Sequence, residues 1–446
     1  MAEQMKESGI QWIGAIPYNW NVERIKHIIQ NNDNGIKVGP FGSALTNEVV
    51  SSDEGKYKVY GQSNLIRKDF SYGDNYVSEQ NYKRLINYEV LPNDIAVSMM
   101  GTIGKCSVVP GNIEPGIMDS HLIKIRLSQK MLPRYFEYAY ESDMGYSQLL
   151  INSKGSIMNG LNSTIVKGLY IPVPEIIEQQ AIVDFLDKEC AQIDSIAADL
   201  EKQIALLQQY KKSLITETVT KGLDKSVPMK DSGVEWIGEI PNTWDCKKMK
   251  YVISEPLQYG ANEAGDDYKE DYPRYIRITD ITEENSLKDD GKLSLSPDIA
   301  KPYLLKDGDL LFARSGATVG KTFYYTSNYG TCAFAGYLIK ARFNQDKMNP
   351  KFVYYTTLGI GYENWKNTVF TQATIQNIGA DKYAQLYITV PSMKEQNEII
   401  AYLDTQCKAI DDVIHSKYQQ LSTIQQHKKS LIYEYVTGKK RVKEVR

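Results

Sequence analysis

One glycine-rich segment of the chain has the residue types of a phosphate-binding loop. Residues 314–322 read RSGATVGKT, so that a lysine and a threonine follow the second of two glycines. The phosphate-binding loop of nucleotide-hydrolysing enzymes needs four residues between its glycines, because its backbone N–H groups must surround a phosphate. Here only three intervene, and the related segment 101–106, GTIGKC, lacks the threonine that would hold magnesium. We therefore interpret both segments as tight turns that present Lys105 and Lys321 rather than as nucleotide sites.

Motifs for other catalytic chemistry are missing from the sequence. An adenine-N6 methyltransferase needs an Asp/Asn-Pro-Pro-aromatic loop, yet the chain has neither a Pro-Pro pair nor an F-x-G-x-G cofactor loop. The fragment Pro297-Asp298 is not followed by the D/E-x-K of a nuclease. The four histidines and five cysteines form no HExxH or CxxC pattern, so we expect no protein-bound zinc. These observations predict a protein without enzymatic activity and without a cofactor.

Two pairs of similar segments divide the chain. Residues 6–29 and 230–253 agree at 11 of 24 positions, and residues 171–220 and 388–437 agree at 22 of 50 positions. The two stretches that lie between these segments are much less alike. The chain therefore alternates variable and shared parts, which predicts two different domains built on one repeated frame.

Each of the longer shared segments should contain one long helix. No proline or glycine occurs between Pro174 and Gly222, or between Pro391 and Gly438. Apolar residues recur every three to four positions, a 3.5-residue period that requires a partner helix, and the most economical partner is the other copy. Lys417 interrupts the pattern once. The rows in the two copies are Leu186, Ile193, Leu200, Leu207 and Leu214, and Leu403, Ile410, Ile424 and Leu431; Ser392 with Glu395 forms a capping box at the start of the second helix.

The variable parts have the pattern of mixed α/β domains. Short apolar runs at 58–60, 169–171 and 275–278 are typical of strands. Clusters of glycine, asparagine and serine between such runs indicate loops.

The order of these motifs resembles the specificity subunits of type I restriction–modification systems. The resemblance covers the whole chain and rests on W-I-G-x-I-P-x-x-W at 12–20 and 236–244, on V-P-x-x-x-E-Q at 173–179 and 390–396, and on a K-K-S-L-I helix end in both copies. It implies two target-recognition domains, each of which reads one half of a split, asymmetric site in double-stranded DNA. It also implies that the two helices pair antiparallel, space the domains and dock two methyltransferase subunits, with translocase–nuclease subunits joining that core.

The repeat and the resemblance together predict a mixed α/β fold with a pseudo-twofold internal repeat. Its expected parts are target-recognition domain 1 at 1–174, spacer helix 1 at 175–224, target-recognition domain 2 at 225–391, and spacer helix 2 with a basic tail at 392–446. The two helices are expected to form an antiparallel coiled coil.

Candidate DNA contacts follow from side-chain chemistry. In the major groove, arginine pairs with guanine and asparagine or glutamine pairs with adenine, whereas lysine contacts phosphates as a point charge. Any one of these residues could equally be an ordinary surface residue. The candidate base readers are Gln62, Asn64 and Arg67 in the first domain and Arg277, Arg314, Gln372 and Gln376 in the second, and the candidate phosphate contacts are Lys105 and Lys321.

Composition sets further bounds on function. The net charge of −3 and the pI of about 6.0 argue against a protein that coats DNA regardless of sequence. There is no apolar run of 18 residues and no start of signal-peptide type, so we expect no membrane segment and a cytoplasmic location. The unpaired, odd number of cysteines fits reduced thiols.

Three other functions were weighed. The nearest is the recognition subunit of a smaller restriction system, in which one partner both methylates and cuts. A coiled-coil scaffold without a DNA role is disfavoured, because a scaffold gains nothing from two different heads on one frame. An ATPase is disfavoured by the spacing of the glycine-rich segments.

Overall fold

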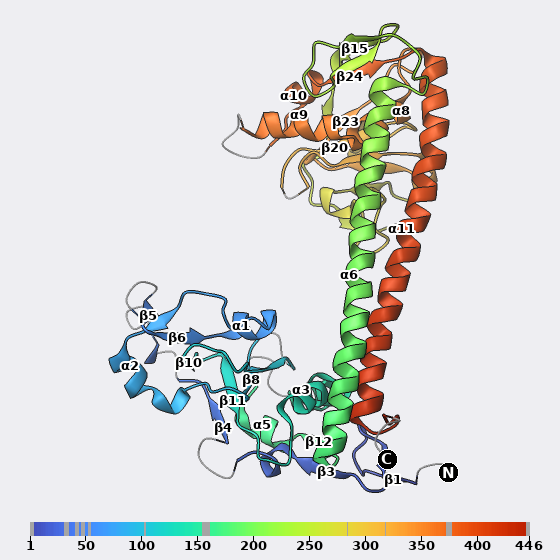
Figure 1. The fold of residues 1–446 in the computed structure, drawn as a ribbon. Coiled ribbons are helices and arrows are strands. Elements are labelled where there is room, and N and C mark those ends of the chain that lie inside the picture. The colour runs from blue at the N-terminus through green and yellow to red at the C-terminus, as the bar shows by residue number, and fades with distance from the viewer. Residues whose placement is uncertain are drawn as a thin grey trace. The chain divides into compact units, whose positions relative to one another are not determined.

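The computed structural model describes residues 4–30, 35–40, 44–45, 50–51, 55–101, 104–153, 161–282, 284–316, 318–371 and 377–442 (Figure 1). It consists of two compact units. Unit 1 contains Met1–Asp199 and Gln420–Arg446, and unit 2 contains Leu200–Gln419. We refer to the predicted recognition segments, 1–174 and 225–391, as domain 1 and domain 2.

The two predicted long helices are present. Helix α6 spans Ile176–Lys221 and helix α11 spans Met393–Val436. Each helix ends at a glycine in the left-handed region, Gly222 at φ +72° and Gly438 at φ +70°, as the sequence indicates. No helix in the described ranges has the length and hydrophobicity needed to cross a membrane.

Within each unit, the helices run antiparallel, which confirms the predicted direction. In unit 1, the Phe185 ring lies 4.4 Å from the Tyr435 ring, and Lys428 Nζ lies 2.6 Å from Asp194 Oδ1. As the residue number increases along α6, from Phe185 to Asp194, the number of the partner on α11 decreases, from Tyr435 to Lys428. Unit 2 repeats this pattern with Lys211 against Asp411 at 2.6 Å and Gln203 against Lys417 at 2.5 Å.

The predicted apolar seam is buried or half-buried along both helices. Leu186 and Leu403 hold equivalent positions and are fully buried. Lys417, which breaks the seam, is half-buried and donates a hydrogen bond from Nζ to Gln203 Oε1. The predicted capping box is also present, since Glu395 N donates to Ser392 Oγ and Ser392 N donates to Glu395 Oε2.

The repeated tryptophan and glutamate hold the frame of each unit together. In unit 1, Trp20 is fully buried and its Nε1 donates to Glu178 Oε2 at 2.9 Å. In unit 2, Trp244 Nε1 donates to Glu395 Oε1 at the same distance. The W-I-G-x-I-P-x-x-W and V-P-x-x-x-E-Q motifs are thus two halves of one contact.

The glutamine that follows each of these glutamates joins the long helix to the recognition domain. Gln179 and Gln396 are fully buried, and every polar atom of each amide group has a backbone partner. Gln179 accepts from Leu132 N and donates to the carbonyls of Lys130 and Pro174; Gln396 accepts from Asn349 N and donates to the carbonyls of Lys347 and Pro391.

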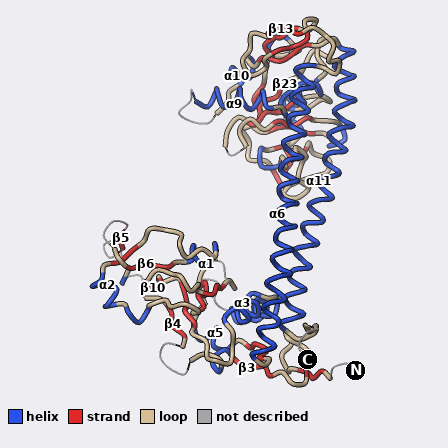
Figure 2. Tube along the Cα trace, in the orientation of Figure 1, coloured by secondary structure: helices blue, strands red, loops and turns tan. Residues whose placement is uncertain are grey.

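Each recognition domain contains two four-stranded sheets, drawn in red in Figure 2. In domain 1 the strand orders are β10-β6-β7-β5 and β4-β11-β8-β9, and in domain 2 they are β17-β19-β18-β22 and β16-β23-β20-β21. The pairs β6–β10 and β18–β22 are parallel, and the remaining pairs in these sheets are antiparallel. The strands of domain 1 are β1 Met5–Glu7, β2 Ala15–Pro17, β3 Asn21–Arg24, β4 Ile36–Val38, β5 Val50–Ser51, β6 Tyr57–Tyr60, β7 Tyr76–Val77, β8 Ile95–Ser98, β9 Cys106–Val108, β10 Gly116–Met118, β11 Leu122–Ile125 and β12 Tyr170–Val173. Those of domain 2 are β13 Met229–Asp231, β14 Glu239–Pro241, β15 Asp245–Lys248, β16 Gln258–Tyr259, β17 Asp266–Asp267, β18 Arg274–Ile276, β19 Leu293–Ser294, β20 Leu310–Ala313, β21 Thr322–Tyr324, β22 Cys332–Phe334, β23 Leu338–Ala341 and β24 Tyr387–Val390.

Both domains also contain short helices. Those of domain 1 are α1 Gln62–Arg67, α2 Glu79–Arg84, α3 Pro133–Glu141, α4 Asp143–Ser153 and α5 Ser163–Gly168, and those of domain 2 are α7 Pro297–Ala300, α8 Pro350–Leu358, α9 Ile360–Thr371 and α10 Ala380–Ala384. The short 3₁₀ helices include η1 Ile25–His27, η4 Met249–Tyr251 and η5 Ile278–Asp280.

One predicted strand is shorter than expected. The run 275–278 was predicted as a strand, but β18 ends at Ile276 and the chain then turns into η5. The cause is Asp280, whose carboxylate accepts a hydrogen bond from Arg277 N at 2.7 Å and closes the turn.

Candidate nucleic-acid interface

Each glycine-rich segment connects two antiparallel strands, a position that suits the predicted turn. In domain 2 the turn joins β20 to β21, and Gly316 and Gly320 adopt φ of +80° and +81°. A phosphate-binding loop leads into a helix, whereas here a strand follows the lysine. The corresponding turn of domain 1 joins β8 to β9.

The two candidate phosphate contacts lie on these hairpins. The Lys105 side chain is 53% exposed, and its Nζ lies 3.9 Å from Glu141 Oε1. Lys321 is half-buried, and its backbone N–H donates to Thr318 O at 2.9 Å. Lys105 is therefore the more accessible of the two.

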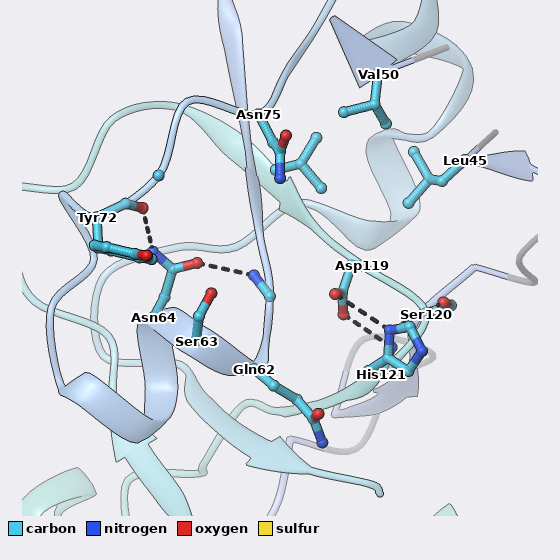
Figure 3. A pocket seen from close by; sticks show the side chains of 13 residues that line it. Leu45, Val50, Gln62, Ser63, Asn64, Tyr72, Asn75, Asp119, Ser120 and His121 are labelled. Carbon is cyan, nitrogen blue, oxygen red and sulfur yellow. Dashed lines mark hydrogen bonds and ion pairs between the residues drawn. The ribbon is translucent and has the colours of Figure 1, made fainter. Parts of the chain in front are cut away.

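Gln62 connects the start of α1 to the β8–β9 hairpin. Its Nε2 donates to Ser98 Oγ and to Met100 O, both at 2.6 Å. The side chain is half-buried and lines a cavity of about 590 Å³ that is shown in Figure 3. The structure thus brings together the tip that carries Lys105 and the helix that carries Gln62 and Arg67.

Asn64 is buried and has its hydrogen-bonding groups occupied within domain 1. Its Oδ1 accepts from Gly61 N at 2.9 Å, and its Nδ2 donates to Tyr72 O at 2.7 Å and to Asp69 O at 3.2 Å. In Figure 3 the amide points toward Tyr72. Asn64 therefore shapes the turn before α1, and its counterpart in domain 2 is Asp280, which closes the same turn.

The candidate arginines have different surroundings. Arg67 is exposed, and its guanidinium carbon lies 4.2 Å from the centre of the Tyr72 ring. Arg277 is half-buried, and its Nη2 donates to Asp280 Oδ1 at 2.7 Å and to Gly291 O at 2.8 Å. The guanidinium of Arg277 is thus engaged inside the domain, whereas that of Arg67 faces solvent.

Arg314 lies at the start of the β20–β21 hairpin. Its guanidinium carbon is 4.9 Å from the centre of the Tyr259 ring, and its buried Nε has no hydrogen-bond partner among the residues that the structure describes. The remaining two candidates, Gln372 and Gln376, lie outside the described residues.

A turn that was not predicted from the sequence lines the same cavity as Gln62. Asp119, Ser120 and His121 connect β10 to β11, and Figure 3 shows the carboxylate of Asp119 facing the ring of His121. Burial raises the pKa of Asp119, although the hydrogen bonds and charge of His121 act in the opposite direction. The repeated Leu-Ile-Lys at 122–124 and 338–340 is the sequence signal that could have located this turn and its counterpart in domain 2.

Comparisons with known proteins agree with the repeated architecture. The family described as the type I restriction modification DNA specificity domain matches residues 39–206 and 261–423, once in each half of the chain. A protein of Methanocaldococcus jannaschii, provisionally named the type I restriction enzyme MjaX specificity subunit, is 24% identical over 97% of this chain and 96% of its own length. The type I restriction enzyme EcoBI specificity subunit of Escherichia coli is 24% identical over 73% of this chain and 71% of its own length.

The fold is also similar to that of a solved structure. A chain from a study of complex assembly and conformational transition of the type I R-M system covers 94% of this chain and 98% of its own length, with a TM-score of 0.67 and 14% identity. The family matches span most of the chain and fall on both copies of the repeat. This chain therefore belongs to the family of type I restriction–modification DNA specificity subunits.

Proposed function

We propose that this chain is the non-catalytic subunit that gives a type I restriction–modification complex its DNA specificity, with each recognition domain reading one half of an asymmetric, interrupted DNA target. The observation that carries the proposal is that the two units share the same contacts between domain and long helix, whereas the exposed loops of the two domains carry different side chains. The Trp–Glu and glutamine contacts that hold each domain to its long helix are the same in both units. The tips that these frames support differ, which is what two unlike half-sites require.

We propose that DNA binds to the end of each domain that carries the glycine-rich hairpin, β8–β9 in domain 1 and β20–β21 in domain 2, together with the neighbouring turns. In domain 1 this end carries Lys105, Arg67 and Gln62, and in domain 2 it carries Arg314 and Lys321. Lysines position a protein on the phosphate backbone, and hydrogen-bonding side chains discriminate base edges in the grooves. Both kinds of group occur at this end of each domain.

The long helices are the proposed docking surface for methyltransferase subunits. Leu206 and Tyr210 on α6 are 54% and 57% exposed, and Val413 on α11 is 45% exposed. Leu206 and Tyr210 lie one helical turn apart on the same face of α6 and form an exposed apolar patch, the kind of surface that marks a protein–protein contact. The equivalent positions of α11 are Thr423 and His427, so this apolar patch itself is not repeated. The proposal of two methyltransferase subunits rests on the duplicated frame, and translocase–nuclease subunits are added to that core.

This docking proposal has a direct test. Replacing Leu206 and Tyr210 by serine should weaken the association with the methyltransferase subunit at least tenfold, because apolar area no longer becomes buried. Replacing Gln208, an exposed residue of the same helix, by serine is the control and should have little effect. Unchanged association of the double variant would assign docking to another surface.

The proposed reading of DNA is tested by mapping the methylated sequence. The chain is co-expressed with its methyltransferase partner, and methylated adenines are located across a plasmid library. The expected motif has two unlike half-sites separated by unspecified bases, and the purified chain alone should transfer no methyl group. A continuous palindromic motif would contradict the two-domain assignment.

A further inference from the structure

One turn in each recognition domain occupies the same place and carries different side chains. In domain 1 it is 119–121, Asp-Ser-His, between β10 and β11, and in domain 2 it is 335–337, Ala-Gly-Tyr, between β22 and β23. Each turn begins at a strand that forms a parallel pair, β10 or β22. It ends at an inner strand of the other, antiparallel sheet, β11 or β23. The two turns are therefore structural counterparts.

The backbone of both turns is held by the same three hydrogen bonds from neighbouring segments. A side chain on such a turn can change without a change in the path of the chain. The bonds in domain 1 are Asp119 N to Tyr60 O at 2.8 Å, Met99 N to His121 O at 3.0 Å, and Gly39 N to Leu122 O at 2.8 Å. Those in domain 2 are Ala335 N to Ile276 O at 2.9 Å, Arg314 N to Tyr337 O at 3.0 Å, and Gly260 N to Leu338 O at 3.2 Å.

The last residue of each turn is exposed and has hydrogen-bonding capacity. The His121 side chain is 51% exposed, and Tyr337 is 61% exposed. His121 Nδ1 lies 3.4 Å from Asp119 Oδ2 and also 3.4 Å from Ser120 Oγ, and both contacts orient the ring. An ionised carboxylate only accepts hydrogen bonds, so the contact with Asp119 requires a proton on Nδ1. With Nδ1 as the donor in this contact, Nε2 is left as an acceptor, and no partner for it is found among the described residues. Tyr337 presents a hydroxyl group and an apolar ring edge.

Three other polar residues at this end of the domains are less free to read bases. The Gln62 amide nitrogen is bonded to the β8–β9 hairpin, Asn64 is buried within its turn, and Arg277 is engaged by Asp280. These contacts support the backbone of the reading end. His121 and Tyr337 differ from them because each is both exposed and carried by a fixed backbone.

We propose that His121 and Tyr337 are specificity-determining residues, each contacting the edge of one base pair in its own half-site. The inference rests on the proposed function, in which each domain reads one half of a split target. A His121 Nε2 that accepts a hydrogen bond suits the exocyclic amino group of adenine or cytosine, the donors that these bases present in the major groove. The hydroxyl group and ring of Tyr337 offer a different contact, so the two half-sites differ at the corresponding position.

The chain contains matched control residues for this proposal. His27 and Tyr251 are the last residues of η1 and η4, at equivalent positions of the repeated frame. Both are exposed, and Tyr251 is 61% exposed, as is Tyr337. The same residue types can thus be removed at and away from the proposed reading tips.

The test uses the full chain in complex with its methyltransferase partner, on the target mapped for the wild-type complex and on all its single-base variants. His121→Ala should reduce discrimination at one base pair of one half-site, roughly 5- to 20-fold for the loss of a single base contact. Tyr337→Ala should do the same in the other half-site. His27→Ala and Tyr251→Ala should leave every position unchanged.

Three outcomes decide the inference. If His121→Ala leaves discrimination unchanged at every position, or slows methylation equally on all sequences, His121 is not a base reader and the inference is wrong. His121→Gln, which keeps a polar side chain, should shift the preferred base at that same position, and it serves as the test if the alanine variant fails to assemble. A wild-type complex without a split target would contradict the proposed function itself, before any variant is compared.

Discussion

The role of a polar side chain in a recognition domain depends on where its hydrogen bonds go. Gln62 and Asn64 are two residues apart in one short segment, and the sequence offers both as base readers. Both line the cavity of Figure 3, but Gln62 is half-buried, whereas Asn64 is only 3% exposed and bonds to three backbone groups. Residue type alone does not separate these two cases.

Asn64→Ala should therefore lower stability and leave DNA specificity unchanged. The substitution removes the hydrogen bonds of the buried Asn64 amide to the partly buried backbone groups of Gly61 and Tyr72, each of which contributes about 0.5–1.5 kcal/mol. Thermal unfolding of wild type and variant measures the loss. Ser63→Ala, at the exposed neighbouring position, should change the unfolding temperature little, and a stable Asn64→Ala variant with altered base preference would contradict this role.

Lys105→Ala should weaken DNA binding without altering sequence preference. Its ammonium group is exposed at a hairpin tip, and a phosphate contact contributes equally on all sequences. Removing one such contact should reduce the slope of log K against log salt by about one. Lys167→Ala, at an exposed position of α5, is the control. A loss confined to one target base would show that Lys105 reads sequence instead.

At the scale of the element, the repeated motifs are the parts that join each domain to the long helices. Trp244 and Trp236 belong to the same motif but differ in their bonding. Trp244 Nε1 donates to Glu395, whereas the buried Nε1 of Trp236 has no partner among the described residues. Substitution of the two tryptophans therefore distinguishes the contribution of the hydrogen bond to stability from the contribution of the ring.

Trp244→Phe should destabilise unit 2 by about 1–3 kcal/mol, because it removes a hydrogen bond to the charged, half-buried carboxylate of Glu395. Trp236→Phe should cost less, because no hydrogen bond is lost. Denaturant unfolding of both variants provides the measurement. Equal losses would show that ring volume, and not the bond to Glu395, is what the motif supplies.

The cost of Trp244→Phe should also depend on pH. Burial raises the pKa of Glu395, but the hydrogen bonds from Ser392 and Trp244 outweigh it, so that the pKa is lowered overall. A carboxylate with a lowered pKa stabilises the folded state above its unfolded pKa of about 4.3, and this stability is lost as the pH falls through the folded value. The difference between wild type and variant should therefore shrink below about pH 4. A constant difference from pH 7 to pH 3 would exclude Glu395 as its source.

The repeated parts of the fold were predictable because local chemistry determines them. The two long helices follow from the absence of glycine and proline, from the heptad spacing, and from a capping box that the structure contains. The hairpin at Lys321 follows from its two glycines. The end of β18 at Ile276 was not predictable in this way, because the side chain of Asp280 captures the Arg277 backbone three residues earlier.

The reading tips were predicted only in part for a similar reason. Arg277 and Asn64 have side chains of the right type, but their partners come from the folding of distant or turn residues. His121 is not predictable from the sequence, because a histidine between two apolar runs has no motif around it. Its position becomes informative only when the two domains are superimposed strand by strand.

At the scale of the whole molecule, each unit contains one recognition domain, the start of one long helix and the end of the other. In unit 1, Gly438 at the end of α11 lies against Trp20, and in unit 2, Gly222 at the end of α6 lies against Trp244. Each frame thus closes around a helix end supplied by the opposite copy of the repeat. We therefore predict that the variable segment of each domain can be exchanged without a change in its frame.

The measurement that tests the account most directly is the methylation motif of a chimera. Residues 30–170 are replaced by the corresponding segment of a relative with a different target, and the chimera is expressed with the original methyltransferase partner. The predicted motif keeps the half-site of domain 2 unchanged and exchanges the other half-site for that of the donor. A chimera that assembles but changes both half-sites together, or neither, would contradict the assignment of one half-site to each domain.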